Sequence, residues 1–377
     1  MASTTGKTIS CRAAICWEAN KPMIIETVEV SPPKKNEVRI KIVATGICRS
    51  DAHVLHGKDI IGPPTKYPLI LGHEAAGIIE SVGEGVTEFV PGDHVIPILM
   101  QQCKNCAFCK SESTNLCLNY NVFKNQVMED DTTRFTCKGQ TIYHFLGTST
   151  FSEYTVVHQY AVAKINPKVD LTKCCIIGCS VLTGYGSALN LAEVSAGTTC
   201  AIWGLGGVGF SVALGCVEKK PKRLIGIDIN EEKFELAKKY GFTEFINPLK
   251  LNEPIQAYLM KDGGVDFAFD CIGNNNVLKD AYASLSMWGR LITVGIPLKD
   301  DVLPIKPAEF LFGRRIIGGF LGGYKTVDGV QLLVDKYINN ELKIDSFVTS
   351  RLKLEQINEG FELLNNGKTI RTVILME

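Results

Sequence analysis

The chain has no excess of either charge. Among its 377 residues, 40 are Lys or Arg and 40 are Asp or Glu, so the formal net charge at pH 7 is zero. Nucleic acids, anionic membranes and strongly acidic substrates are recognised by basic surfaces. The balanced composition therefore argues against all three as partners.

The sequence also lacks the features of a secreted or membrane protein. Its first residues, MASTTGKTISCRAA, contain no long apolar segment behind a basic start, so they do not predict a secretory signal. Residues 194–217 are uncharged, but their six glycines belong to a nucleotide-binding pattern rather than to a membrane span. Without a signal, the 14 cysteines are expected to be reduced thiols in the cytoplasm.

Four of the cysteines form one short metal-binding pattern. Cys103, Cys106, Cys109 and Cys117 follow the spacing C-x2-C-x2-C-x7-C within QQCKNCAFCKSESTNLC. Four thiolates in so short a segment suit the tetrahedral preference of Zn²⁺, and they leave no position for a substrate. The pattern predicts a structural zinc, with an iron–sulfur cluster as the main alternative.

Three further candidate metal ligands lie far apart in the sequence. Cys48 stands in GICRSDAH, His73 in GHE and Cys179 in IIGCS. Each alone is more typical of a core residue, but two thiolates and one imidazole together can hold a catalytic zinc with one open position. The remaining cysteines are more typical of the hydrophobic core: Cys11, Cys16, Cys137, Cys174, Cys175, Cys200, Cys216 and Cys271.

A dinucleotide-binding pattern follows. Residues 199–203 predict a buried strand, GLGGVG comes next, and residues 210–217 continue as an apolar helix. The glycines permit a tight turn that brings a pyrophosphate to a helix N-terminus. A second predicted strand, residues 223–228, ends in Asp228, which would bind both ribose hydroxyls and repel a 2'-phosphate. The pattern predicts NAD rather than NADP; a glycine-rich loop in an unrelated α/β domain is the alternative.

The remaining patterns divide the chain into two domains, as its length suggests. Strands at residues 265–271 and 291–294 and a helix at 277–285 extend the β/α alternation and predict a doubly wound parallel sheet. Before residue 180, short alternating runs separated by Pro and Gly predict an antiparallel β-rich domain; they cover residues 37–43, 77–82 and 93–98. The tail predicts helices and a final strand without indicating its domain; these cover residues 329–337, 354–365 and 372–376.

Specific motifs run through almost the whole chain: GICRSDAH, LGHEAAGIIESVGEGV, the four-cysteine segment, RFTCKG, FLGTSTFSEYTVV, GLGGVGFSV, GIDINEEKF and KTIRTVIL. Together they resemble the zinc-dependent alcohol dehydrogenases of the medium-chain family, animal type. The resemblance implies a GroES-like catalytic domain over residues 1–180, with the zinc lobe at about 100–120, and a Rossmann domain over 181–320. Residues 321–377 would return to the first domain. It also implies a homodimer joined through the Rossmann sheets.

The resemblance assigns roles to individual residues. It implies a catalytic zinc held by Cys48, His73 and Cys179, with Glu74 beside it and Asp51 fixing the ring of His73. With the structural zinc, this makes two zinc ions per chain. Arg49 and Arg371 would clamp the NAD pyrophosphate, Lys233 would contact the ribose, and Thr183 and Val208 would press on the nicotinamide, although by themselves the basic residues are more typical of surface charges. The full set implied for the coenzyme is Arg49, Thr183, Gly204, Gly206, Gly207, Val208, Gly209, Asp228, Lys233, Val294 and Arg371.

The implied reaction is the reversible oxidation of an alcohol to an aldehyde or ketone. Zinc would lower the pKa of the substrate hydroxyl. Ser50 would take the proton, and the ribose hydroxyls and His53 would pass it to solvent, because an imidazole accepts and releases protons near pH 7.

Two departures from the family pattern bear on the function. After Cys179 the family usually reads Gly-Phe-Ser-Thr, but here the residues are Ser180, Val181, Leu182 and Thr183, which puts the coenzyme fit at this junction in question. The second departure is in the substrate pocket.

In the expected pocket, Leu99 stands where many relatives carry an aromatic residue, and Ser50 is smaller than the frequent Thr. Phe145 and Leu146 would remain as apolar walls. We therefore expect a roomier pocket than in an ethanol-preferring enzyme, one that favours longer or bulkier apolar alcohols, retinol among them.

Three other functions are compatible with parts of the pattern. A zinc-ribbon nucleic-acid binder would explain the four cysteines. Such a protein should have a basic surface and no nucleotide-binding pattern, and this sequence agrees with neither expectation. A non-catalytic protein on the same scaffold should have lost a zinc ligand or a relay residue, and none is missing. A glutathione-dependent formaldehyde dehydrogenase needs a basic residue near the lobe to hold the glutathione carboxylate; the nearby positions Leu118, Asn119, Tyr120 and Asn121 offer none.

Overall fold

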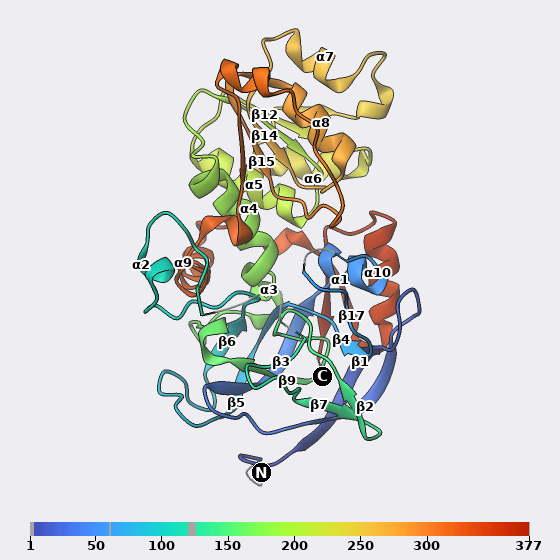
Figure 1. Ribbon diagram of the computed structural model, residues 1–377. Helices are drawn as coiled ribbons and strands as arrows, with labels where there is room; N and C mark the ends of the chain where they lie inside the picture. The colour runs from blue at the N-terminus through green and yellow to red at the C-terminus, as the bar shows by residue number, and fades with distance from the viewer. Residues whose placement is uncertain (1–3, 60–61, 120–125, 377) are drawn as a thin grey trace. The chain divides into compact units, whose positions relative to one another are not determined.

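The computed structural model describes residues 4–59, 62–119 and 126–376. The chain divides into two compact units (Figure 1): Met1–Cys179 with Lys325–Glu377, and Ser180–Tyr324. The second unit is therefore inserted between two segments of the first. The sequence predicts this insertion at residues 181–320.

The second unit is built on a six-stranded sheet in which all neighbouring strands run parallel. Its strand order, β13-β12-β11-β14-β15-β16, reads 3-2-1-4-5-6 when the strands are counted within the unit, which is the order of a doubly wound dinucleotide-binding fold. Its central strands are continuous apolar runs because both faces of the sheet are covered. The strands are β11 (Thr199–Trp203), β12 (Arg223–Ile227), β13 (Glu244–Ile246), β14 (Val265–Asp270), β15 (Leu285–Thr293) and β16 (Arg315–Gly318).

The helices of this unit alternate with its strands. They are α4 (Leu182–Gly186), α5 (Gly207–Glu218), α6 (Glu232–Ala237), α7 (Ile255–Met260) and α8 (Asn275–Ala283). The predicted helix over residues 277–285 was wrong at its end, because α8 stops at Ala283 and Leu285 begins β15. Leu285 is fully buried and pairs with Val265, so burial in the sheet outweighs its helical spacing.

Two sheets form the first unit, and nearly all of their pairings are antiparallel, as predicted. The five-stranded sheet contains β4 (Leu69–Ile70), β1 (Ile9–Cys16), β2 (Ile24–Val30), β7 (Phe135–Cys137) and β8 (Gln140–Ile142). The seven-stranded sheet contains β10 (Val162–Lys164), β6 (His94–Pro97), β5 (Glu74–Val82), β3 (Glu37–Gly46), β18 (Arg371–Leu375) and β17 (Val348–Lys353), with β9 (Tyr154–His158) paired to β3. Because β18 pairs with β3, the C-terminal tail completes this sheet.

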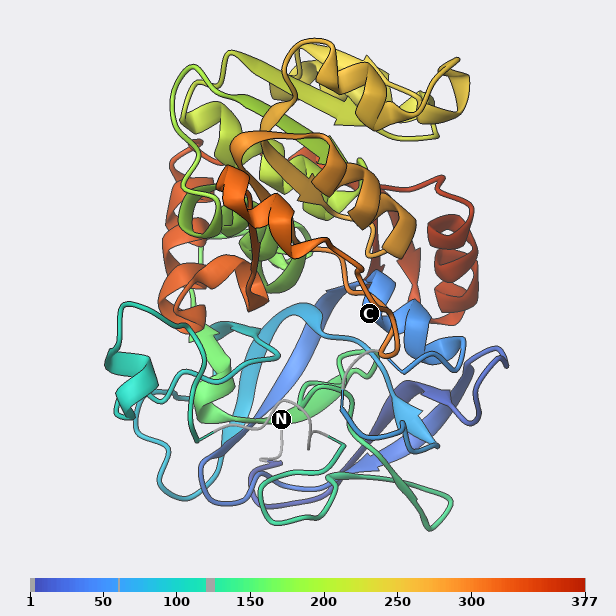
Figure 2. The ribbon, with the colours of Figure 1, turned by 45° about the horizontal axis from the view of Figure 1, so that its top comes forward.

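The helices of the first unit bring distant segments together. They are α1 (Arg49–Leu55), α2 (Ala107–Lys110), α3 (Leu171–Cys174), α9 (Thr326–Ile338) and α10 (Ile357–Asn365). Figures 1 and 2 both show α10 beside α1 and α9 beside α2. The C-terminal segment thus packs against α1, which follows Cys48, and against the four-cysteine segment.

Each unit has its own hydrophobic core. In the first unit, apolar side chains from β1, β2 and α10 pack together, and a smaller cluster forms on β3 and β5. In the second unit, the core lies between the parallel sheet and α7 and α8. Within the described part of the chain, no helix is both long enough and apolar enough to cross a membrane.

Candidate functional site

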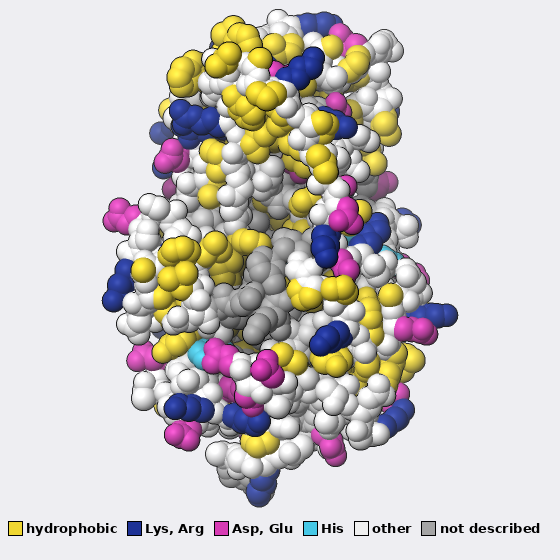
Figure 3. All heavy atoms as spheres, in the orientation of Figure 1, with side chains coloured by type: hydrophobic (Ala, Val, Ile, Leu, Met, Phe, Trp, Pro, Cys, Tyr) yellow, Lys and Arg dark blue, Asp and Glu magenta, His cyan; other side chains and the backbone are white. Residues whose placement is uncertain are grey.

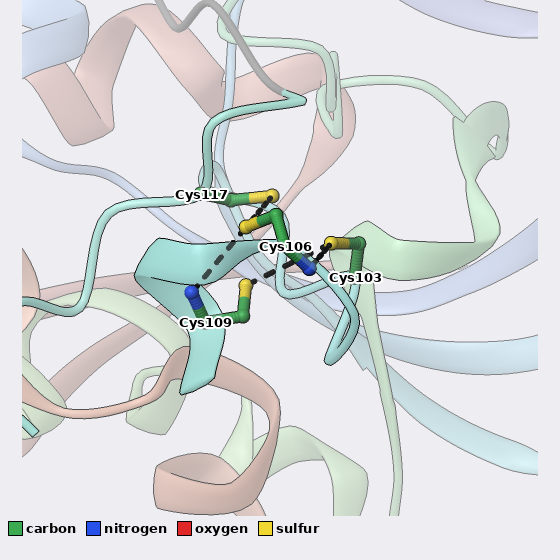
Figure 4. Close-up of side chains that lie close together, drawn as sticks. All are labelled: Cys103, Cys106, Cys109 and Cys117. Carbon is green, nitrogen blue, oxygen red and sulfur yellow. Dashed lines mark hydrogen bonds between the residues drawn. The ribbon is translucent and has the colours of Figure 1, made fainter. Parts of the chain in front are cut away.

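The four cysteines of the lobe converge on one point (Figure 4). The sulfurs of Cys103 and Cys109 are 3.9 Å apart, and those of Cys106 and Cys117 are 4.0 Å apart. All four are free thiols, and their sulfurs lie within 4.8 Å of one another. Sulfurs bound to one zinc by tetrahedral bonds of 2.3 Å are about 3.8 Å apart. The spacing therefore fits a single zinc ion, whereas a cluster with several irons would separate the sulfurs further.

Backbone N–H groups donate hydrogen bonds to the cysteine sulfurs and stabilise the thiolate form. The N–H groups of Cys106 and Cys109 donate to the sulfurs of Cys103 and Cys106 at 3.4 and 3.3 Å. The bonds from the N–H groups of Cys109 and Leu118 lower the pKa of Cys106 to about 6. A thiolate is the form that binds zinc, so the local backbone favours metal binding before any ion is present.

A second cluster forms where α1, β5 and the end of the N-terminal segment meet. The ligand atoms of Cys48, His73, Glu74 and Cys179 all lie within 4.8 Å of one another, and all four side chains are buried in this cluster. These are the three zinc ligands and the adjacent carboxylate that the family resemblance implies. Residues separated by more than 100 positions are brought together here only by the fold.

Asp51 holds two of these ligands in place. Its Oδ2 accepts a hydrogen bond from the backbone N–H of Cys48 at 2.9 Å, which caps α1. Its Oδ1 accepts from the N–H of Gly72 and lies 3.1 Å from Nδ1 of His73. Nε2 of His73 is buried and has no hydrogen-bond partner among the described residues. This nitrogen is therefore available for a metal ion, as Asp51 fixes the other side of the ring.

Glycines make the room that this cluster needs. Gly72 has φ of +94°, and a Cβ there would lie 2.6 Å from Oγ1 of Thr150. A Cβ on Gly46 would lie 2.7 Å from Oε2 of Glu74. Cys179 itself lies in a π-helical segment, Ile177–Val181, a distortion that often marks functional sites.

The electrostatics of the cluster fit a divalent cation. A hydrogen bond from the Cys179 thiol lowers the pKa of Cys48 well below that of an ordinary thiol, although burial opposes this. The same bond and burial raise the pKa of Cys179, and burial raises the pKa of Glu74 to about 8. Without a metal ion, these shifts favour a thiolate at Cys48 and a neutral thiol at Cys179. A zinc ion would supply the positive charge that stabilises both thiolates.

Arg371 lies beside this cluster. Its Nε is 3.3 Å from Oε2 of Glu74, and its Nη1 donates to the carbonyl of Ile47 at 2.9 Å. Burial alone would lower the pKa of Arg371, but the charges of Glu74 and Cys48 outweigh burial and raise it. The family resemblance implies a pyrophosphate clamp at this position. The pairing with Glu74 was not predicted, because no local pattern links β18 to β5.

The predicted relay residues lie on α1. Oγ of Ser50 is 4.0 Å from the sulfur of Cys48, and His53 lies three residues further along, on the same helix face. Burial and the charge of Arg49 lower the pKa of His53, so its ring is neutral and can accept a proton at pH 7. The guanidinium of Arg49 donates to the carbonyl of Leu364 at 3.2 Å and to Oδ1 of Asn365 at 3.1 Å.

In the second unit, the glycine turn has the shape of a dinucleotide site. Gly204 has φ of +92°, and a Cβ on Gly209 would lie 2.0 Å from the carbonyl oxygen of Gly204. These two glycines therefore allow the turn to pack against α5. Gly206 is the N-cap of α5, Gly207 begins the helix, and a Cβ on Gly206 would meet nothing within 4 Å. This open space at a helix N-terminus fits a pyrophosphate.

Asp228 follows β12, at the same edge of the sheet. Its Oδ2 accepts from the N–H of Leu205 at 2.8 Å and from Nζ of Lys233 at 2.9 Å, and its Oδ1 accepts from the N–H of Asn230. The structure thus brings together both residues that were assigned to the ribose. A carboxylate held against the glycine turn by the N–H of Leu205 would repel a 2'-phosphate, which favours NAD over NADP.

The other predicted coenzyme contacts in this unit lie near α5 and β15. A Cβ on Gly184 would lie 2.3 Å from the carbonyl oxygen of Val208, so α4, which carries Thr183, packs directly on the start of α5. Val294 follows β15, and its N–H donates to the carbonyl of Asp270 at 2.9 Å. Arg49 and Arg371, the two predicted pyrophosphate clamps, belong to the first unit. Tyr120 and Asn121, two of the positions inspected for a basic residue, lie outside the described residues.

Comparisons with known proteins agree with this geometry. Residues 34–167 match the family model described as "Alcohol dehydrogenase GroES-like domain", and residues 204–335 match "Zinc-binding dehydrogenase". An alcohol dehydrogenase class-3 of Drosophila melanogaster is 49% identical over 380 residues, which are 99% of this chain and 100% of that protein.

Two solved structures are also similar. One is an alcohol dehydrogenase zinc-binding domain protein from Burkholderia ambifaria, with a TM-score of 0.89, and the other is a benzyl alcohol dehydrogenase from Acinetobacter calcoaceticus, with a TM-score of 0.88. Both are 26% identical, and both matches cover 98% of this chain and 100% of the other. The chain belongs to the zinc-dependent alcohol dehydrogenases of the medium-chain family, oxidoreductases that act on alcohols with zinc and NAD as cofactors.

Proposed function

We propose that this protein oxidises an apolar alcohol of medium or greater length, reversibly and with NAD. The observation that carries the proposal is the buried cluster of Cys48, His73 and Cys179, in which Nε2 of His73 has no protein partner among the described residues. A zinc ion held there would act as a Lewis acid on the substrate hydroxyl. Oε2 of Glu74 lies 3.3 Å from Nε of Arg371, so the guanidinium would balance a negative charge on this carboxylate beside the metal.

Ser50 and His53 would remove the substrate proton. Oγ of Ser50 lies 4.0 Å from the sulfur of Cys48, a proposed zinc ligand, and this hydroxyl can both donate and accept a hydrogen bond. His53 is neutral near pH 7 and lies closer to solvent than Ser50 does. Their order along α1 supports a path from the metal toward the surface.

The substrate preference rests on the side chains around the cluster. The ring of Phe145 meets the ring of His73 edge to face, with 5.8 Å between centroids. A Cβ on Gly178 would lie 2.7 Å from Cγ2 of Ile96, so the end of β6 packs on the segment that carries Cys179, and buried Leu99 follows it. Aliphatic and aromatic walls favour a long apolar substrate, since each buried methylene contributes roughly 0.8 kcal/mol.

A second candidate is the glutathione-dependent oxidation of formaldehyde. It is favoured by the 49% identity to a class-3 alcohol dehydrogenase, the class of the glutathione-dependent formaldehyde dehydrogenases. Such an enzyme needs a cation near the lobe for the glutathione carboxylates. Of the positions inspected there, Leu118 is exposed and apolar, and the side-chain amide of Asn119 donates to the sulfur of Cys103. Neither position supplies a charge.

The deciding experiment compares initial rates for ethanol, hexanol, octanol, retinol and S-hydroxymethylglutathione, each with NAD and with NADP. We expect the highest kcat/KM for octanol or retinol with NAD. A kcat/KM for S-hydroxymethylglutathione that exceeds those of all four alcohols would establish the second candidate instead. A preference for NADP would contradict the assignment of Asp228.

We further propose a homodimer in the cytoplasm. Strand β16 lies at the edge of the parallel sheet, and its Arg315 lies over the ring of Trp288, which is 71% exposed. Leu311, between β15 and β16, is 87% exposed. Figure 3 shows hydrophobic side chains gathered on one face of the second unit. An exposed apolar patch beside an open sheet edge favours a second copy as partner. Light scattering during gel filtration should give twice the chain mass of 41.3 kDa, and fractionation should place the protein in the cytosol.

A further inference from the structure

A buried carboxylate at the edge of the coenzyme sheet has no role in the chemistry described above. Asp270 ends β14 and is fully buried. Its Oδ1 accepts from the N–H of Ile272 at 3.0 Å, and both of its oxygens lie 3.1 Å from the N–H of Gly273. Its side chain thus folds the following residues into a tight turn.

The same residue also holds the neighbouring strand. The backbone carbonyl of Asp270 accepts from the N–H groups of Val294 and Gly295 at 2.9 and 2.7 Å. A Cβ on Gly295 would lie 2.1 Å from the backbone nitrogen of Gly273, so the two segments touch with no side chain between them. Asp270 is therefore the common anchor of the segments that follow β14 and β15.

The turn that Asp270 folds reaches the glycine motif. Cγ1 of Ile272 would lie only 2.7 Å from a Cβ on Gly204, so this side chain covers the glycine turn. The side chain of Ile272 is 44% exposed, although its backbone is fixed by the hydrogen bond to Asp270. Isoleucine is more often fully buried, so this apolar surface is available to a ligand. Ligands of doubly wound folds bind at this carboxyl edge of the sheet.

Burial of the carboxylate has a cost. Burial raises the pKa of Asp270 to about 6, although the N–H groups of Ile272 and Gly273 oppose this rise. A neutral side chain would avoid that cost but could not accept every hydrogen bond that the carboxylate accepts. Both oxygens lie 3.1 Å from the nitrogen of Gly273, so an amide NH₂ in either position would face the N–H of Gly273.

We propose that Asp270 is a positioning residue for the dinucleotide, whose side chain sets coenzyme affinity by holding Ile272 over the glycine turn. The proposal rests on the dinucleotide site proposed above. Asp270 acts through the turn and touches no reacting atom. Its loss should therefore weaken coenzyme binding without slowing the chemical step.

The test is Asp270→Asn, which keeps the shape of the side chain but turns one acceptor into a donor. Whichever way the amide is seated, its NH₂ group meets the N–H of Gly273, and the turn must shift. An unsatisfied buried donor weakens an equilibrium by about 10-fold or more. We expect the Kd for NADH, measured by its fluorescence, to rise by about 10-fold. At saturating NAD, kcat should be unchanged or higher, and the KM for the alcohol should stay within about 2-fold.

Asp266→Asn is the matched control. Asp266 lies on the same strand, near its opposite end, and its Oδ2 also accepts a backbone N–H, that of Thr199, at 2.8 Å. Both variants should lower the melting temperature, but only Asp270→Asn should weaken NADH binding. Equal Kd values for the two variants and the wild type would overturn the proposal.

Asp270→Glu replaces Asp270→Asn if the latter does not fold, because it keeps the charge and displaces the acceptors by one methylene. It should also weaken NADH binding, and a folded Asp270→Glu with wild-type affinity would likewise overturn the proposal. Failure of the wild type to bind NADH at all would instead refute the proposed function.

Discussion

The side-chain ammonium of Lys325 donates a hydrogen bond of 2.7 Å to the carbonyl oxygen of Ser111, 214 positions earlier in the chain. It also donates to the carbonyl of Phe108 at 2.8 Å. Both acceptors lie in the four-cysteine lobe, whereas Lys325 is the N-cap of α9. One side chain therefore ties the lobe to the segment that follows the inserted unit.

Replacing Lys325 with Ala should release this attachment. Charge-assisted hydrogen bonds contribute about 1.5 to 3 kcal/mol each, so we expect a loss of about 2 kcal/mol in unfolding free energy and faster loss of the lobe zinc to a chelator. Lys104→Ala is the control, since Lys104 pairs with Asp328 at 3.0 Å on the exposed surface. That pair should contribute less than about 1 kcal/mol. Equal effects of the two variants would contradict a special role of Lys325.

The two zinc sites should separate structure from chemistry. Wild-type protein should contain two zinc ions per chain by metal analysis. Cys48→Ala should lose one ion and all turnover while keeping the fold, because its site is open to substrate. Cys106→Ala should lose the other ion and become less stable or less soluble, since a closed thiolate site contributes folding free energy. A wild type with one zinc per chain, or none, would contradict this assignment.

The pocket wall at Leu99 should control chain-length preference. The KM of the wild type should fall as the alcohol lengthens from ethanol to octanol, because each further methylene is buried. Leu99→Phe should weaken that trend by filling the channel, and Leu99→Met, of similar volume, should keep it. Flat kinetics across the series in the wild type would show that Leu99 does not line the channel.

His53 should determine the pH dependence of alcohol oxidation. Burial lowers its pKa from the ordinary value of 6.5, so the neutral, proton-accepting form dominates at pH 7 and disappears only below that value. The wild-type rate should therefore rise through an inflection below pH 6.5. His53→Gln should remove this inflection and slow oxidation by about 10-fold to 100-fold at neutral pH.

Small exogenous bases should restore part of the lost rate, because they replace the missing proton acceptor. Ser50→Ala should be more severe than His53→Gln and should not be rescued in the same way. An unchanged pH profile in His53→Gln would mean that the proton leaves by another route.

His144 should contribute to acid sensitivity. Burial, with the nearby charge of Arg134, lowers its pKa to about 3, and its Nε2 accepts from the N–H of Arg134. Because the pKa of His144 is lowered in the folded state, its contribution to the free energy of unfolding is fully present above pH 6.5. That contribution is lost as the pH falls from 6.5 toward 3. At pH 5 the loss is on the order of 2 kcal/mol. His144→Gln keeps an acceptor but does not titrate, so urea unfolding of this variant should depend less on pH between 6.5 and 5; an equal slope would exclude His144 as a source.

Much of the protein follows from local sequence. The lobe cysteines lie in one short segment, so their spacing alone indicates a closed metal site, and their sulfurs do converge. The order of strand, glycines, helix, strand and Asp228 also indicates the dinucleotide fold, since each part is defined by its neighbours along the chain. Local patterns of apolar residues also predicted some strands in each unit, among them residues 37–43 and 77–82 in the first and residues 199–203 and 223–228 in the second.

Only the tertiary structure places residues from distant segments together. Pairing of β3 with β5 and the packing of α1 bring Cys48, His73 and Cys179 within reach of one ion, although each alone is typical of a core residue. Pairing of β18 with β3 sets Arg371 beside Glu74, and the return of the chain at Lys325 ties down the lobe. Spacing along a chain determines contacts within one turn or one loop, whereas these contacts depend on how sheets pair over hundreds of residues, which local patterns do not encode.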